Sequence, residues 1–246
     1  MLKKDCVLNN NFINLYNKFC PGPLTFILKL KKNSKVSKLV TNKKKTLAVR
    51  FPSHSKAKNL LKILNYPLAA PSANISSRVS PVTRDHVKEE FGRKIKYIIE
   101  GGHSEIGLES TIINLIGKPE ILRIGSIDIS KLSKALKIKL IYRKKTNINV
   151  PGQNRVHYSP GIPLRMNCKK VSLDEAFILV KKRNNSNKNF FYLSKNKNLK
   201  EAAKNLYSVL RIIKKKGYKK IAVEKIENKG IGTAINDRLH KAATKK

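Results

Sequence analysis

The 246-residue chain is 40% apolar, which is enough for a buried core in one large or two modest domains. Its first fifteen residues mix Lys, Asp and Asn, and no run approaches the ~18 uncharged apolar residues of a membrane helix, so we expect neither a signal peptide nor a membrane span. Three widely spaced cysteines without a CxxC pair argue against a disulfide framework or a zinc site, and they predict reduced thiols in a cytoplasmic protein.

The charge is strongly positive, because 54 Lys and Arg residues face 15 Asp and Glu, a formal net charge of +39. Such a balance suggests a polyanionic partner such as tRNA or double-stranded RNA. However, Arg contributes only 11 of the 54 cations, and the Lys residues are spread along the whole chain. Two interpretations therefore stay open: an RNA-binding surface, or the lysine usage of an AT-rich genome at tolerant surface positions.

In chain order, residues 24–30 and 46–51 are predicted to be short strands, rich in β-branched and aromatic side chains. Apolar residues recur at helical spacing from Ala57 to Leu64, which predicts a helix. Thr83 is a candidate N-cap for a helix over 84–91. The other elements predicted in this half are strands at 68–70, 97–100, 111–115 and 120–122 and a helix at 130–136.

The pattern stops between residues 143 and 163, where prolines, glycines and asparagines predict a linker or an ordered loop. Beyond it, strands alternate with helices, which predicts a small α/β unit with a partly parallel sheet. These elements are strands at 177–180, 190–193 and 221–223 and helices at 199–215 and 231–243. We therefore expect two domains, 1–142 and 164–246, joined by a linker over 143–163.

Several short segments are more specific than a fold pattern. They are, in order, Pro21-Gly22-Pro23-Leu24-Thr25, Ala48-Val49-Arg50-Phe51-Pro52, Ala69-Ala70-Pro71-Ser72-Ala73-Asn74, Ser80-Pro81, Glu109-Ser110-Thr111, Leu122-Arg123-Ile124-Gly125, Pro151-Gly152, His157-Tyr158-Ser159-Pro160 and the run from Gly230 to Leu239. In order and spacing they resemble the YrdC-like family of threonylcarbamoyl-AMP synthases, in its longer form with a C-terminal accessory domain. The resemblance covers roughly residues 19–165 and 170–243.

The resemblance implies an α/β protein with a YrdC-like twisted mixed sheet, followed by a small Rossmann-like α/β domain. It also implies an activity, the formation of threonylcarbamoyl-AMP and pyrophosphate from threonine, bicarbonate and ATP. That product serves the threonylcarbamoyladenosine modification at position 37 of tRNA. ATP is then a substrate, Mg²⁺ its expected companion, and a threonylcarbamoyl-transferase complex the expected downstream partner.

The chemistry of such a reaction sets its own requirements. The carboxylate of a threonine-derived carbamate attacks the α-phosphorus of ATP in line, so the site acts by positioning groups and stabilising negative charge. It needs cations and hydroxyl or amide donors around the phosphates, but no nucleophilic side chain. The sequence holds neither a G-x-S-x-G motif nor a Cys–His signature, and we expect no covalent catalytic residue.

Arg50 is the first candidate site residue. It ends an apolar strand and is followed by Pro52, and a guanidinium there suits a bidentate contact with a carboxylate. By resemblance Arg50 binds the threonine carboxylate, and Ala70 and Ser110 complete the threonine-binding set. The plain alternative for Arg50 is an ordinary surface ion pair.

The resemblance also implies a set of ATP contacts. Ser72 and Asn74 lie in a tight Pro-Ser-Ala-Asn loop, where they would contact phosphate oxygens or a bound metal, although such a loop is by itself more often only a turn. We expect this loop and Arg50 to face one shared cavity. His157 and Tyr158 would form a lid that shields the adenylate from water, the alternative being surface packing. The complete set is Thr46, Ser72, Asn74, Ser80, Arg123, His157 and Tyr158.

The first twenty residues depart from the family pattern. Ahead of its Pro-Gly-Pro-Leu-Thr segment the family has a Lys-x-Arg element and threonine-pocket residues, which the residues before Pro21 do not reproduce. We therefore expect an N-terminally incomplete catalytic domain with weak or absent activity. A start site placed too late, a partner chain carrying the missing piece and a decayed gene are the alternatives. The competing functions are a basic RNA-binding module and an inactive remnant of the enzyme.

Overall fold

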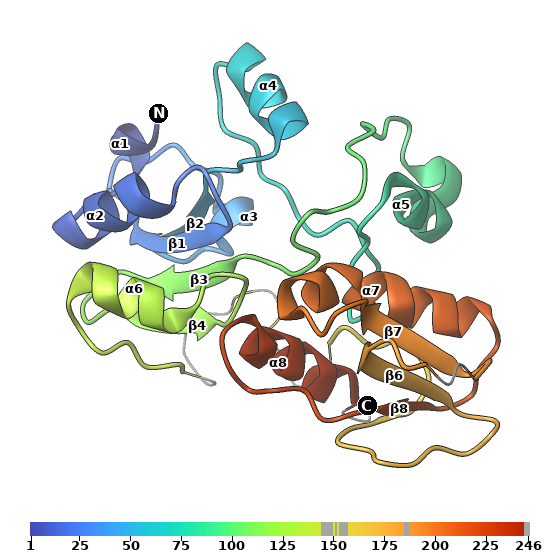
Figure 1. Cartoon of the computed structure of the whole chain (residues 1–246). Coiled ribbons are helices and arrows are strands. Elements are labelled where there is room, and N and C mark those ends of the chain that lie inside the picture. Colours follow the sequence, from blue (N-terminus) through green and yellow to red (C-terminus); the bar gives the residue numbers. More distant parts are fainter. Residues whose placement is uncertain (144–149, 151, 153–156, 185–186, 244–246) are drawn as a thin grey trace. The chain divides into compact units, whose positions relative to one another are not determined.

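The computed structural model describes residues 1–143, 150, 152, 157–184 and 187–243. The chain forms two compact units, one of Met1–Pro71 and Glu109–Gln153 and the other of Ser72–Leu108 and Asn154–Lys246. Within the described residues each unit holds a four-stranded sheet (Figure 1). The linker expected over 143–163 lies partly outside the described residues. Ser72–Leu108 groups with the C-terminal half, and the expected domain limits stay a prediction.

The sheet of the first unit is mixed, as the resemblance implies. Its strand order is β2-β1-β3-β4, in which β1 runs antiparallel to β2 and parallel to β3, and β3 runs antiparallel to β4. The two central strands are buried over nearly their whole length, which explains their continuous apolar sequences. The strands are Leu24–Lys29 (β1), Thr46–Arg50 (β2), Thr111–Asn114 (β3) and Glu120–Arg123 (β4).

Two amphipathic helices of the first unit bury their apolar faces. In α2 (Asn10–Phe19), the ring of Phe12 meets Phe26 of β1 edge-on, with ring centroids 5.0 Å apart. Beside it lies α6 (Ile129–Leu136), whose Ala135 carbonyl accepts a hydrogen bond from Asn14 Nδ2 at 2.8 Å (Figure 1). The short helices of this unit are α1 (Leu2–Asp5), α3 (Lys38–Thr41) and α4 (Ser55–Ile63).

The sheet of the second unit is parallel in every described pair, with the order β5-β8-β6-β7. In the chain, α7 (Leu199–Lys215) connects β7 to β8, the two strands that flank β6 in the sheet, and it packs against β6 and β7 (Figure 1). The strands are Leu164–Arg165 (β5), Ala176–Lys181 (β6), Phe190–Ser194 (β7) and Ile221–Val223 (β8). The other helices are α5 (Arg84–Phe91), the 3-10 turn η1 (Gly92–Lys94) and α8 (Ile231–Ala243), which packs beside α7.

Two predicted strands, at 68–70 and 97–100, are wrong. Neither stretch pairs with any described strand, and Leu68, Tyr97 and Ile99 are exposed. The aromatic and β-branched residues at 97–99 favour a strand only where a neighbouring strand accepts their backbone hydrogen bonds, and the short apolar run at 68–70 has no such partner either. The other predicted strands and helices form with their ends within about two residues of the expected ones. The helix α2 was not predicted, although its cap, Asn9, accepts from Phe12 N as capping requires.

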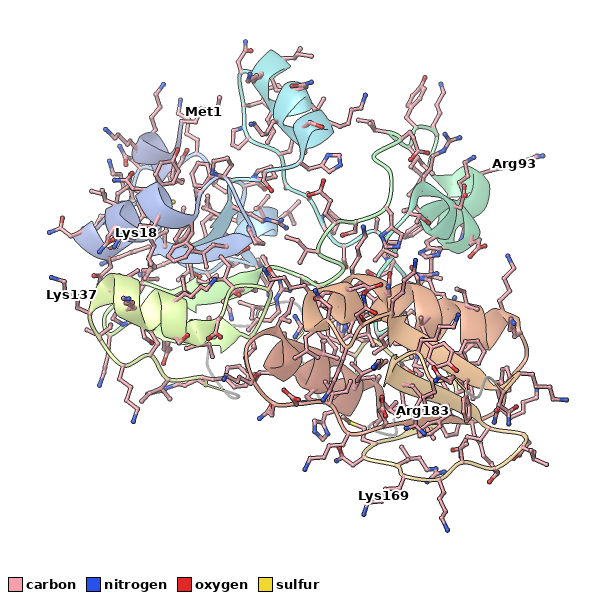
Figure 2. All side chains as sticks on the ribbon, viewed as in Figure 1. Met1, Lys18, Arg93, Lys137, Lys169 and Arg183 are labelled. Atoms are coloured by element: carbon pink, nitrogen blue, oxygen red, sulfur yellow. The ribbon has the colours of Figure 1, made fainter. Side chains whose placement is uncertain are left out.

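Basic side chains project from both units. Lys18 on α2 and Lys137 after α6 belong to the first unit, and Arg93, Lys169 and Arg183 belong to the second (Figure 2). The positive charge is thus spread over both units, as the spread of Lys residues along the whole sequence predicts. In the described part of the chain, no helix combines the length and the apolar character needed to cross a membrane.

Gly125, which follows β4, lies against the backbone that leads into β3. A Cβ at this position would come within 2.2 Å of Thr111 N and 2.4 Å of the Ser110 carbonyl carbon. Gly125→Ala is therefore expected to lower the free energy of unfolding by about 2–3 kcal/mol, as overpacking against a rigid neighbour does. Urea unfolding followed by circular dichroism measures the change.

Gly117→Ala is the matched control, because a Cβ there meets nothing within 4 Å. Its left-handed backbone, with φ at 68°, is expected to cost about 1 kcal/mol. Equal losses for the two variants would contradict the explanation by close approach at Gly125.

Candidate functional site

Three of the predicted site residues meet at one end of the first sheet. Arg50 closes β2 and stands opposite Thr25 in the β1–β2 register. Arg123 closes β4, and Ser110 directly precedes β3. β2 runs antiparallel to β1, and β4 runs antiparallel to β3. The last residues of β2 and β4 therefore lie at the end of the sheet where β1 and β3 begin. The strand pairing therefore brings Arg50, Ser110 and Arg123 together.

Ser110 is the centre of a buried hydrogen-bond network. Arg123 Nε donates to the Ser110 carbonyl oxygen at 3.0 Å and Nη2 donates to Ser110 Oγ at 2.9 Å. Ser110 Oγ also shares a hydrogen bond with Thr25 Oγ1, at 2.7 Å. All three residues are at most 9% exposed. Charge-assisted bonds in a buried setting fix the Arg123 guanidinium in one orientation. Thr25 was not predicted as a site residue, although it ends the Pro-Gly-Pro-Leu-Thr segment.

Arg50 lies next to this network and lacks a matching carboxylate. Its Nε donates to the Gly22 carbonyl at 3.3 Å, and no Asp or Glu among the described residues forms an ion pair with it. Although part of the residue reaches solvent, burial and then the positive charge of Arg123 lower the pKa of Arg50. Burial also raises the pKa of the Cys20 thiol to about 11, so this neighbour is neutral at pH 7.

The alternative role of Arg50, an ordinary surface ion pair, would need an Asp or Glu beside it, and the described part of the chain places none there. Two guanidinium groups that raise each other's electrostatic energy favour an anion between or beside them. A carboxylate suits the planar fork of Arg50 by shape as well as by charge. The geometry thus offers an anion site supported by buried hydroxyl groups.

Two other predicted residues of the first unit lie elsewhere. Thr46 begins β2, opposite Lys29, on the same strand face as Arg50 but four residues away, which corresponds to about 13 Å. Ala70 lies in the exposed irregular stretch that follows α4. The structure thus does not bring Thr46 to the Ser110 network. The expected nucleotide contact of Thr46 and the expected threonine contact of Ala70 stay predictions.

The loop Ser72–Ser80 of the second unit holds three of the expected ATP contacts. Asn74 is buried, and its Nδ2 donates to the Ile75 carbonyl at 2.9 Å and to the Arg78 carbonyl at 3.2 Å. Its Oδ1 is also buried and finds no hydrogen-bond partner among the described residues. Leaving a buried carbonyl oxygen unpaired costs about 1–3 kcal/mol. Asn74 Oδ1 is therefore a candidate for a ligand contact, while Ser72 is exposed and Ser80 half-buried in the same loop.

The donor atoms of this loop fit a magnesium ion that is held mainly by phosphates. The described residues include no group of three His, Cys, Asp or Glu side chains that could hold a metal. Mg²⁺ bound with a nucleotide commonly takes one or two protein oxygens and otherwise phosphate oxygens and water. The free Asn74 Oδ1 is a hard oxygen ligand of the required kind.

The structure places His157 and Tyr158 in the second unit. The Tyr158 ring is 1% exposed and stacks on Tyr207 with centroids 5.8 Å apart. The buried Arg238 guanidinium lies 5.0 Å from the same ring. His157 N donates to the Lys241 carbonyl of α8 at 3.3 Å. The ring of Tyr158 is thus packed in the interior, and the expected lid and its ATP contacts stay a prediction.

Two family models match the chain. The Sua5/YciO/YrdC model, described as "Telomere recombination", matches residues 1–125. A model described as "Threonylcarbamoyl-AMP synthase, C-terminal domain" matches residues 121–244. Together they account for both of the regions in which the sequence resembles the family.

Named relatives agree with these models. A threonylcarbamoyl-AMP synthase of Pyrococcus abyssi is 34% identical over 93% of this chain, and one of Schizosaccharomyces pombe is 33% identical over 95% of it. The chain spans 72% of the first protein and 66% of the second. The crystal structure of P. abyssi Sua5 complexed with L-threonine matches 96% of this chain and 75% of that one, with a TM-score of 0.85 and 30% identity.

The Ser110 network makes a prediction about stability. Ser110→Ala removes the acceptor of Arg123 Nη2 and the partner of Thr25 Oγ1, so we expect it to lower the free energy of unfolding by about 2–3 kcal/mol. Thr25→Val is expected to cost about 1 kcal/mol, because it removes a single neutral hydrogen bond. Urea unfolding of the two single variants and the double variant gives the coupling.

The double variant should lose about 1 kcal/mol less than the sum of the single losses, since both single variants break the same bond. Ser130→Ala, on the exposed first turn of α6, is the control and should change little. Strictly additive losses would contradict the shared hydrogen bond.

Proposed function

The chain belongs to the threonylcarbamoyl-AMP synthase family, and from this premise we propose that it forms threonylcarbamoyl-AMP and pyrophosphate from threonine, bicarbonate and ATP. The enzymes of this family are of the nucleotidyltransferase type. The Pyrococcus abyssi relative, whose structure is described as complexed with L-threonine, supports threonine as a substrate. In the proposed role, the product supplies the threonylcarbamoyl group for adenosine 37 of tRNA through a transferase complex. The cytoplasm is the proposed compartment.

The observation that carries the proposal is the anion site formed by Arg50 beside the Arg123–Ser110–Thr25 network. We assign the threonine carboxylate to the Arg50 guanidinium, which has no carboxylate partner among the described residues. Arg123, whose expected ATP contact stays a prediction, adds a second positive charge that hydrogen bonds to Ser110 fix in place. Ser110 accepts from Arg123 at its carbonyl and hydroxyl oxygens, so it would hold that guanidinium toward the amino acid.

The proposed reaction proceeds without a covalent enzyme intermediate. Threonine nitrogen and bicarbonate combine to a carbamate with loss of water. A carbamate oxygen then attacks the α-phosphorus of ATP. The bond from that phosphorus to pyrophosphate breaks, and pyrophosphate leaves with the electron pair of the broken bond. The residues bind and orient the two substrates, which supplies most of the rate increase in such a reaction.

We assign the nucleotide to the loop Ser72–Ser80. Asn74 Oδ1 would contact Mg²⁺ or a donor of the nucleotide, and the hydroxyl groups of Ser72 and Ser80 would contact phosphate oxygens. When bound, Mg²⁺ would neutralise charge on the phosphates. Arg50 and this loop belong to different compact units.

The activity itself is tested by pyrophosphate release. We expect release, at the weak level predicted for this chain, only when threonine, bicarbonate and ATP are all present. No release is expected when any one of them is omitted, because the carbamate cannot form or cannot react. Calorimetric titration with L-threonine and with ATP provides a second measurement that does not depend on turnover. A chain that releases no pyrophosphate and binds neither ligand would contradict the proposed function.

Arg50→Met tests the assignment of the threonine carboxylate. Loss of a bidentate charged contact is expected to weaken L-threonine binding by at least about 30-fold, the equivalent of about 2 kcal/mol. The control is Arg143→Met, an Arg of the same unit that already pairs with Glu120 at 2.8 Å. The two variants are compared by calorimetric titration. Threonine binding that is as tight in Arg50→Met as in Arg143→Met would exclude Arg50 from the site.

A further inference from the structure

An ion pair between α5 and α7 contacts the loop Ser72–Ser80. Arg211 Nη2 of α7 donates to Glu90 Oε1 of α5 at 2.9 Å, and the two side chains are 14% and 6% exposed. The same nitrogen donates to the Val79 carbonyl at 2.6 Å. Glu90 Oε2 faces Arg78 at 3.7 Å and accepts from Ile75 N at 3.5 Å. One ion pair therefore contacts the loop at three positions.

The loop has little regular structure that would hold it otherwise. None of its residues belongs to a helix or to a named strand. Its other contacts include those of the Asn74 amide within the loop, the bond from Arg78 N to the Ile75 carbonyl at 3.1 Å, and the bond from Ser159 N to the Ser77 carbonyl at 2.9 Å, which belongs to an isolated bridge between Arg78 and Ser159. Irregular segments take their conformation from such side-chain contacts. A charged pair that is largely buried is the strongest of them.

The same helix contacts the rest of the segment Ser72–Leu108. Gly107 is packed against α7 so closely that a Cβ would come within 2.4 Å of the Lys204 Cα. Further along, Ser208 Oγ is 3.0 Å from His103 Nε2, and Arg211 and Lys215 pair with Glu90 and Glu89. Positions 204, 208, 211 and 215 follow the spacing of one helix face. This face of α7 therefore runs along the segment that carries the loop.

Arg211 makes both contacts through one nitrogen. The two N–H groups of Nη2 donate to the Glu90 carboxylate and the Val79 carbonyl at the same time. The carboxylate in turn compensates the buried positive charge, which would otherwise be costly. Both halves of the pair are needed to hold the loop.

We propose that Arg211, acting through Glu90 and the Val79 carbonyl, is a positioning residue for the nucleotide, which holds the loop Ser72–Ser80 in the conformation that presents Asn74 Oδ1. The inference rests on the proposed function, because it assigns ATP to that loop. It extends that function by giving a helix of the region matched by the C-terminal family model a role in ATP binding. Arg211 itself touches no substrate in this role.

The test compares Arg211→Met with Lys215→Met in the whole chain. Lys215 is the matched control, because it lies one turn further along α7 and pairs with the neighbouring Glu89 at 3.4 Å, but with both side chains exposed. We expect Arg211→Met to weaken binding of a non-hydrolysable ATP analogue about tenfold and to change L-threonine binding less than twofold. Lys215→Met should change neither. Arg211→Lys, which keeps the charge but has a shorter side chain and a different donor geometry, should fall between them.

Hydrogen exchange at the amides of residues 72–82 gives a readout that is independent of any ligand. It should be at least about tenfold faster in Arg211→Met than in Lys215→Met, while exchange in β1 and β3 stays unchanged. Unchanged exchange in the loop, or equal loss of ATP and threonine binding, would overturn the inference; if Arg211→Met does not fold, the same comparison is made with Arg211→Lys. Failure of the wild-type chain to bind ATP would instead contradict the proposed function, and the exchange result would still decide whether Arg211 holds the loop.

Discussion

The buried guanidinium of Arg123 is the constraint on which the candidate site depends. A charge with so little exposure is tolerated only where hydrogen-bond acceptors surround it, and Ser110 supplies two of them through its carbonyl and hydroxyl oxygens. The register of β1, β3 and β4 places Thr25, Ser110 and Arg123 side by side. A change in strand pairing would therefore also disrupt the candidate site. Ser110 itself contributes no negative charge to this network. Burial first, and then the positive charge of Arg123, lower the pKa of the nearby Arg50.

A site of this kind selects its ligand by charge and shape rather than by reactivity. Its groups are guanidinium, hydroxyl and amide, and the neighbouring Cys20 thiol is protonated at pH 7. Nothing in such a set becomes covalently bound during a reaction, which suits a transfer between two bound substrates. The overall positive charge adds attraction for ATP and tRNA without specificity. Since its Lys and Arg side chains project from both units (Figure 2), the charge by itself does not indicate a nucleic-acid surface.

The sequence predicts the parts of this protein that depend on local pattern. The core strands β1, β3 and β6 follow from their apolar runs, and α5 follows from Thr83, whose Oγ1 accepts from His86 N at 3.3 Å. The stretches at 68–70 and 97–100 were misassigned, because strand propensity does not reveal whether a partner strand is present. Arg50, Ser110 and Arg123 were identified through motifs. Thr25 and the pair of Glu90 and Arg211 were not identified, because their roles come from long-range contacts. Thr25 and Ser110 are separated by 85 positions in the sequence, and Glu90 and Arg211 by 121.

The long-range contacts also explain why the segment Ser72–Leu108 belongs to the same compact unit as the C-terminal half. This segment begins with a loop that belongs to no helix and to no sheet strand. A ligand-binding loop needs a defined conformation before it binds, since ordering it at that moment would reduce the affinity. The face of α7 from Lys204 to Lys215 supplies the rigid support, and Arg211 supplies the charged contact. In the proposed function, the region matched by the C-terminal family model would thereby support nucleotide-binding residues that lie in the region matched by the first model. A substitution on α7 would then alter ATP affinity although α7 lies more than a hundred residues from the loop in the sequence, because the contacts of Arg211 join the two in the fold.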